Sequence, residues 1–153
     1  MISTRPTILV IDDCTDIARI ISRYLEGAGF RTQTANGGIA GREMMSATKP
    51  DAIVLDLMMP GMSGAEFLHA LRRDPDTADI PVVLVSARVG HHGTHFRSEV
   101  DADFVVGKPF TRQQIVGAVR TALGAKAGVT SEVLPPLRMD AKTRLAHQLG
   151  LIR

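Results

Sequence analysis

The chain has 153 residues, of which 44% are hydrophobic and 22% are charged, and its formal net charge is +2. These values are typical of one globular domain with a short appendage. The single cysteine excludes an internal disulfide framework. No apolar run has the length of a signal peptide or a transmembrane helix, so the sequence predicts a cytoplasmic protein that does not enter a membrane.

The charge is unevenly distributed. Residues 1–124 carry 13 Lys and Arg against 14 Asp and Glu (net −1), whereas residues 125–153 carry 5 against 2 (net +3). The basic character therefore belongs to the C-terminal segment. It does not indicate a nucleic-acid surface on the main domain.

The first third of the chain alternates strand and helix patterns. Residues 7–11 are an unbroken apolar run, which predicts a buried strand that ends at Asp12 and Asp13. Residues 31–35 predict a more polar edge strand. Between them, helical spacing predicts a helix with one apolar face: Ile17, Ile20, Ile21, Tyr24 and Leu25.

The middle of the chain repeats this alternation. A second helix is expected to end near Thr48, with Ala40, Met44 and Ala47 on one face. Residues 52–55 predict a strand buried on both faces that ends at Asp56. A third helix over residues 64–73 is predicted to bury Phe67, Leu68 and Leu71.

Two more strands follow, residues 81–85, which end at Ser86, and residues 104–106, which precede Lys108. Residues 90–99 contain two glycines, so only a short, mobile helix is expected there. Thr111 predicts the cap of a last helix that buries Ile115, Val119 and Ala122. Strands that alternate with helices in this way predict an α/β fold with a doubly wound parallel sheet and helices on both faces.

Four buried strands end in residues that can carry chemistry: Asp12 with Asp13, Asp56, Ser86 and Lys108. In a parallel sheet these ends meet at one edge, where ligands bind. Two carboxylates about 5 Å apart repel by roughly 3 kcal/mol at an effective dielectric constant near 20. A divalent cation that prefers oxygen ligands, Mg²⁺ or Mn²⁺, would relieve that repulsion, and an Asp carboxylate can accept a phosphoryl group.

Together with Met59-Pro60-Gly61, Gly64 and Pro109-Phe110, these residues resemble the receiver domain of bacterial two-component response regulators, over residues 7–123. The resemblance implies a flavodoxin-like, five-stranded sheet of order 2-1-3-4-5. It also implies that a sensor histidine kinase or a phosphotransfer protein is the partner of this chain.

The resemblance assigns a role to each site residue. Asp56 would accept the phosphoryl group from a phosphohistidine. Asp12, Asp13, Asp56 and the carbonyl of Met58 would hold Mg²⁺.

Two further residues, Ser86 and Lys108, would bind the phosphoryl oxygens. The Lys108-Pro109 peptide would be cis. The covalent chemistry would be limited to self-catalysed phosphoryl transfer and autodephosphorylation, without further enzyme activity.

Val105 departs from the family pattern, which has Tyr or Phe three residues before the lysine. Phe104 lies one residue earlier, and strand alternation places it on the opposite face. Either a bulge re-aims Phe104 or the aromatic switch is missing, and we expect that it is missing.

Two other groups of residues invite alternative interpretations. His91, His92 and His95 have the spacing of metal ligands, but solvated loop histidines are the simpler interpretation. Cys14 is expected to be a small packing residue.

Residues 1–124 form the predicted receiver domain, and residues 125–153 are predicted to be a linker and a short amphipathic tail. The tail stripe consists of Ala141, Leu145, Leu149 and Ile152. This tail is too short for a helix-turn-helix unit, so nucleic-acid binding through this chain alone is not expected.

The preferred hypothesis is a phosphorylated switch whose output is protein–protein interaction with an effector that the sequence does not identify. Homodimer formation stays open. The alternatives are the receiver part of a DNA-binding transcription regulator and a Mg²⁺-dependent phosphohydrolase. The second alternative normally needs an Asp-x-Asp pattern, whereas Asp12 and Asp13 are adjacent.

Overall fold

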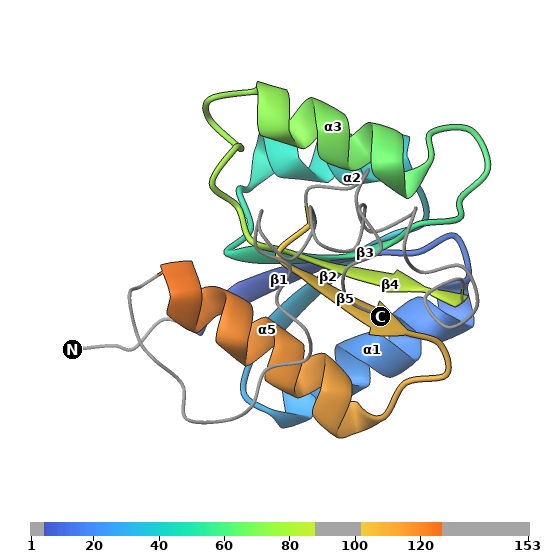
Figure 1. Cartoon of the computed structure of the whole chain (residues 1–153), viewed down its shortest axis with the longest axis vertical. Helices are drawn as coiled ribbons and strands as arrows, with labels where there is room; N and C mark the ends of the chain where they lie inside the picture. The colour runs from blue at the N-terminus through green and yellow to red at the C-terminus, as the bar shows by residue number, and fades with distance from the viewer. Residues whose placement is uncertain (1–4, 88–101, 127–153) are drawn as a thin grey trace, which may run out of the picture.

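The computed structural model describes residues 5–87 and 102–126 (Figure 1). The strands are β1 (Thr7–Ile11), β2 (Arg31–Ala35), β3 (Ala52–Asp56), β4 (Val82–Ser86) and β5 (Phe104–Gly107). The helices are α1 (Thr15–Gly27), α2 (Gly38–Ala47), α3 (Gly64–Arg73) and α5 (Arg112–Lys126). The expected helix over residues 90–99, the three histidines and the amphipathic stripe lie outside the described residues.

The strands form one parallel sheet of five in the order β2-β1-β3-β4-β5, which confirms the predicted topology. Helices α1 and α5 cover one face of the sheet, and α2 and α3 cover the other (Figure 1). All five residues of β3 and of β4 are buried, as expected for central strands. The predicted edge strand, β2, has only one fully buried residue, Ala35.

Successive residues of each strand point to alternate faces, so the sheet separates two apolar clusters. The cluster under α1 and α5 contains Val10, Val54 and Val85. The cluster under α2 and α3 contains Ile11, Leu55 and Leu84. Consecutive residues of a strand thus belong to different apolar clusters.

Three predictions about single positions are wrong. Ile20 is 40% exposed, because α1 rests on the face that carries Ala18, Ile21, Ser22 and Leu25, rotated from the predicted stripe. Ala47 is exposed, because α2 packs closely through Gly41, where a Cβ would lie 2.7 Å from the Ile11 side chain. Cys14 is exposed instead of packed, because it precedes the first turn of α1.

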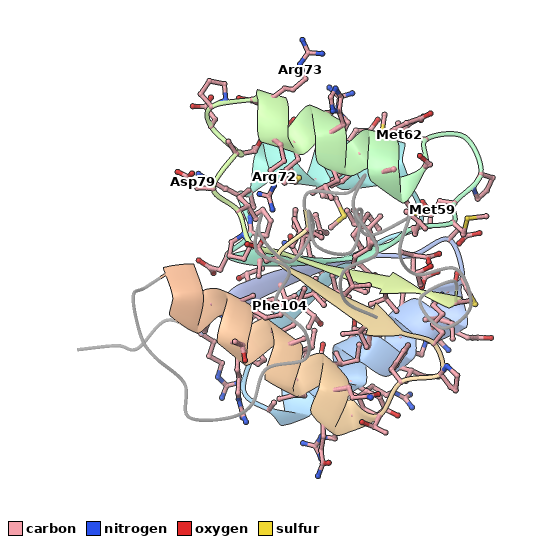
Figure 2. All side chains as sticks on the ribbon, viewed as in Figure 1. Met59, Met62, Arg72, Arg73, Asp79 and Phe104 are labelled. Carbon is pink, nitrogen blue, oxygen red and sulfur yellow. The ribbon has the colours of Figure 1, made fainter. Side chains whose placement is uncertain are left out.

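The register of β5 decides whether a bulge re-aims Phe104. Val83 pairs with Phe104 and Ser86 with Gly107 in regular sequence, so no bulge re-aims the ring. Phe104 is fully buried in the cluster under α1 and α5 (Figure 2). Val105 belongs to the cluster under α2 and α3. The bulge that would re-aim Phe104 is therefore absent, and Phe104 and Val105 lie on opposite faces of the sheet, as strand alternation predicted.

Across the described part of the chain, no helix combines the length and the apolar character that crossing a membrane requires.

Candidate functional site

The carboxyl ends of β1, β3 and β5 bring three charged side chains together. The Lys108 Nζ lies 3.4 Å from Asp56 Oδ1 and 3.5 Å from Asp12 Oδ2. Both carboxylates are buried, at 2% exposure for Asp12 and 5% for Asp56, while Lys108 is 24% exposed. Residues up to 96 positions apart in the chain thus meet at one edge of the sheet, as the strand ends predicted.

Lys108 reaches this position through the turn after β5. Its backbone N–H donates to the Ser86 carbonyl at 3.0 Å, which continues the β4–β5 ladder by one residue. The next peptide, Lys108-Pro109, is cis, as the family resemblance implied. Lys108 is therefore held by the ladder on one side and by the proline turn on the other.

The surroundings of the Asp56 carboxyl group disfavour its charged form. Burial raises the pKa of Asp56, and the negative charge of Asp12 raises it further. Lys108 and the Met58 backbone N–H, which both donate to the carboxylate, lower the pKa. The net result is a pKa of about 6, raised from 3.8.

Asp12 has the same kind of environment. Burial raises its pKa, while the Cys14 backbone N–H, which donates to Asp12 Oδ1 at 2.9 Å, and Lys108 lower it. The site thus holds two buried carboxylates against one lysine, and the negative charge is not fully compensated.

The donor set fits a hard divalent cation. Within the described residues, Asp12, Asp13 and Asp56 offer carboxylate oxygens that lie within 4.8 Å of one another. Asp13 is exposed and faces solvent, so it can bind a cation that keeps part of its hydration shell. Oxygen donors of this kind suit Mg²⁺ or Mn²⁺.

Two predicted site residues are less directly placed. Ser86 ends β4, which pairs with β3, and its side chain is fully buried. Met58 contributes a backbone N–H to Asp56, and its side chain is 53% exposed. The roles assigned to the Ser86 hydroxyl and to the Met58 carbonyl remain predictions.

Sequence reasoning placed Gly64 in the family motif but gave it no physical role. Gly64 starts α3 where the loop passes the end of β3, and its N–H donates to the Leu57 carbonyl at 2.9 Å. A Cβ at Gly64 would meet the carbonyl oxygen of Asp56 and would lie 2.7 Å from Leu57 Cα. A glycine after a Pro-Gly turn is the only sequence signal for such a close approach.

Two features near the site were not predicted from the sequence. They are the hydrogen bond from the Met58 backbone N–H to Asp56 and the cap of α3. Ser63 and Glu66 form a capping box, with Ser63 Oγ accepting from the Glu66 N–H at 3.1 Å. The Ser-x-x-Glu pattern was visible in the sequence and predicts this cap. No sequence pattern indicates the hydrogen bond from the Met58 N–H, because it depends on the path of the loop.

Comparison with known proteins agrees with this geometry. Residues 8–120 match the family described as the response regulator receiver domain. The chain therefore belongs to the receiver-domain family of response regulators.

Among curated relatives, the chain is 35% identical to the transcriptional regulatory protein PrrA of Mycobacterium leprae, over 95% of this chain and 64% of PrrA. It is also 35% identical to the phosphate regulon transcriptional regulatory protein PhoB of Pseudomonas aeruginosa, over 76% of this chain and 51% of PhoB. The chain thus spans between half and two thirds of the length of these two transcriptional regulators.

A solved structure has the same fold. The signal receiver domain of a signal transduction histidine kinase from Syntrophus aciditrophicus matches with a TM-score of 0.75 and 27% identity. The match covers 84% of this chain and 98% of that chain. The fold is thus that of a signal receiver domain.

Proposed function

We propose that Asp56 is the phosphoryl acceptor of this receiver domain and that a histidine kinase or a phosphotransfer protein is the donor. The observation that carries the proposal is the contact of Lys108 with both buried carboxylates, Asp12 and Asp56. An ammonium group at this point can neutralise charge on an incoming phosphoryl group, which is the main requirement of phosphoryl transfer.

In the proposed step, an oxygen of the ionised Asp56 carboxylate forms a bond to phosphorus, and the bond between phosphorus and the histidine nitrogen of the donor breaks. The imidazole leaves with its electron pair and takes up a proton from solvent. Lys108 and the Ser86 hydroxyl bind oxygens of the transferred group. Because the pKa of Asp56 is about 6, most of the acceptor is ionised at neutral pH.

Asp12, Asp13 and Asp56, with the Met58 carbonyl, would hold Mg²⁺, which when bound supplies positive charge that stabilises the phosphoryl oxygens. Hydrolysis of the acyl phosphate by water would return the protein to its starting state. The proposed covalent chemistry is thus confined to Asp56.

A small phosphodonor with Mg²⁺ tests this proposal. Intact-mass measurement should detect one added phosphoryl group on the native chain and none on Asp56→Asn. Asp79→Asn, which replaces an exposed carboxylate outside the site, is the matched control and should label normally. Labelling of Asp56→Asn at the native level would refute the assignment.

The proposed output is protein–protein interaction that depends on phosphorylation. Phosphorylation adds a charge of about −1.5 to −2, which can shift a two-state equilibrium. Pull-down with and without a beryllofluoride-type mimic of the phosphoryl group should identify partners that bind only the activated state. Equal recovery under both conditions would contradict a phosphorylation-dependent output.

A second candidate function is the receiver part of a DNA-binding regulator, and the alignment with PrrA favours it. That alignment covers 151 residues and so extends past the end of α5. A salt-sensitive gel shift that is lost in Lys142→Ala and Arg144→Ala would support this function.

A further inference from the structure

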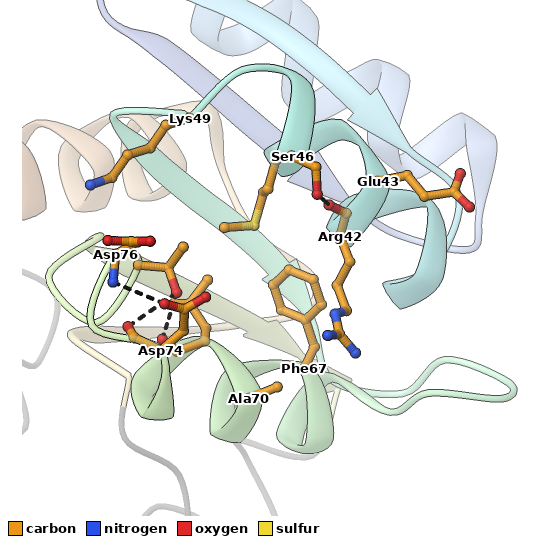
Figure 3. A pocket seen from close by; sticks show the side chains of 11 residues that line it. Arg42, Glu43, Ser46, Lys49, Phe67, Ala70, Asp74 and Asp76 are labelled. Atoms are coloured by element: carbon orange, nitrogen blue, oxygen red, sulfur yellow. Dashed lines mark hydrogen bonds between the residues drawn. The ribbon is translucent and has the colours of Figure 1, made fainter.

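A groove of about 500 Å³ lies between α2 and α3, away from the carboxylate site (Figure 3). Its apolar lining includes Met45 from α2 and Phe67 and Leu71 from α3. Its lining residues Lys49 and Thr77 precede β3 and β4, so the groove opens toward the amino ends of the strands. The volume is in the range of about 300–1,000 Å³ that is usual for binding sites.

The rim of the groove is charged on both sides. Arg42 and Lys49 line it beside α2, and Asp74 and Asp76 line it at the end of α3 (Figure 3). Neither aspartate makes an ion pair within the described residues. With Glu43, the lining carries three acidic and two basic side chains, so its net charge is −1.

We propose that the C-terminal segment of this same chain, residues 127–153, docks in this groove. The sequence of the segment complements the groove, since Leu145, Leu149 and Ile152 fall at helical spacing. The segment carries four basic residues and two acidic ones, which gives a net charge of +2. Its apolar stripe can pack on Met45 and Ala70, which are half-buried and lie above the buried Phe67 and Leu71. Its basic residues complement Asp74 and Asp76 on the rim.

The position of the segment favours docking on its own chain. Helix α5 ends at Lys126, and the carboxyl ends of α3 and α5 lie at the same edge of the sheet (Figure 1). Residues 127–139 can extend over about 43 Å at 3.3 Å per residue. A domain of about 100 residues has a radius of gyration near 13 Å, so this linker can reach the groove around the edge.

Because residues 127–153 are covalently joined to the domain, a weak contact with the groove is sufficient for docking. A tether of this length holds the two parts that it joins at an effective concentration of about the millimolar range. An amphipathic segment as short as residues 140–153 is a marginal helix in water alone and gains stability when its apolar face is covered. The half-buried side chains of Met45 and Ala70 supply that cover.

Paramagnetic broadening in the full-length chain tests the proposal. A nitroxide is attached at Gln148→Cys in a Cys14→Ser background, because the native Cys14 is exposed. We expect selective broadening of the amide signals of Met45, Ser46 and Ala70, with those of α1 and α5 unaffected. Leu145→Ser combined with Leu149→Ser should remove the broadening.

Charge variants separate specific docking from general proximity. Asp76→Lys should reduce the broadening at least twofold, and the matched control Asp79→Lys, outside the groove in the same loop, should not (Figure 2). Adding Arg144→Glu to Asp76→Lys should restore it. These measurements use the unphosphorylated protein, so their outcome is independent of the function proposed for Asp56.

Three results would overturn the proposal. The first is broadening spread over α1 and α5, and the second is no selective broadening. The third is the same broadening in a mixture of an isotope-labelled chain without nitroxide and a spin-labelled chain without isotope. That result would assign the groove to a second copy.

Discussion

Asp56 links the chemistry of the site to the stability of the fold. Its pKa is about 6 in the folded protein, mainly through burial and then through Asp12, against 3.8 in an unfolded chain. A raised carboxyl pKa means that the folded state holds the proton more tightly. The contribution of this group to stability is therefore fully present below about pH 4 and is lost as pH rises through about 6.

We therefore expect Asp56→Asn to be more stable than the native chain at pH 7.5 without divalent cations, by up to about 3 kcal/mol for a shift near 2 pKa units. The difference should shrink toward pH 4. Urea unfolding at several pH values measures it, with Asp79→Asn as the control. A difference that stays constant across this pH range would contradict the assigned cause.

Gly64 occupies a position where an added side chain would clash with the backbone at the end of β3. Gly64→Ala places a methyl group against the carbonyl of Asp56 and the Cα of Leu57, which are backbone atoms that cannot rotate away. We expect a loss of about 1–3 kcal/mol in unfolding free energy and weaker phosphoryl labelling, because β3 must shift. Gly37→Ala, where a Cβ meets nothing within 4 Å, is the control. Unchanged labelling and stability in Gly64→Ala would show that the loop relaxes freely.

Particular residues show how far sequence reasoning extends. Asp12, Asp56 and Lys108 were predicted to meet because each follows a buried parallel strand, and topology alone decides where such ends lie. Ile20 was misplaced, because apolar character does not fix the rotation of a helix against the sheet. Cys14 was misplaced, because it lies before the first turn of α1 and not on its packed face. Gly64 and the Met58 N–H depend on the exact path of a loop, which no periodic pattern encodes.

At the scale of elements, Arg72 joins the end of α3 to the sheet. Its guanidinium donates to the carbonyls of Ala78 and Ile80 at 2.9 and 2.6 Å. It also pairs with Asp103 at 3.0 Å, and the same carboxylate oxygen accepts the Val82 N–H. One side chain thus fixes the loop before β4 and the start of β5.

We expect Arg72→Lys to lower the free energy of unfolding by about 2–3 kcal/mol, because a lysine cannot reproduce the planar set of donors. Arg73→Lys is the matched control, since Arg73 points away from the domain (Figure 2). Urea unfolding measures both variants. Equal effects of the two substitutions would contradict the role given to Arg72.

In the whole molecule, the packed fold holds the site residues together, and the charges of these residues lower the stability of the fold. Two apolar clusters hold the strand ends in place, and the carboxylates at those ends repel one another. A cation that binds only the folded protein should therefore raise stability. At a Mg²⁺ concentration 100 times its dissociation constant the gain is about 2.7 kcal/mol.

Urea unfolding with Mg²⁺ and with a chelator measures this gain. Asp13→Asn should reduce it, because Asp13 is exposed and offers one of the three clustered carboxylates. Asp79→Asn should keep it. Equal stabilisation by Mg²⁺ in Asp13→Asn and the native chain would place the cation elsewhere.

The edge-on contact of Tyr24 with Phe110 has a practical consequence. The ring centroids are 6.4 Å apart at an interplanar angle of 87°, and Phe110 lies two residues after Lys108. The chain contains no tryptophan and no other tyrosine. Ultraviolet emission from this protein thus comes essentially from one phenol beside the turn that carries the site lysine, so the native molecule has a built-in optical probe and needs no attached dye.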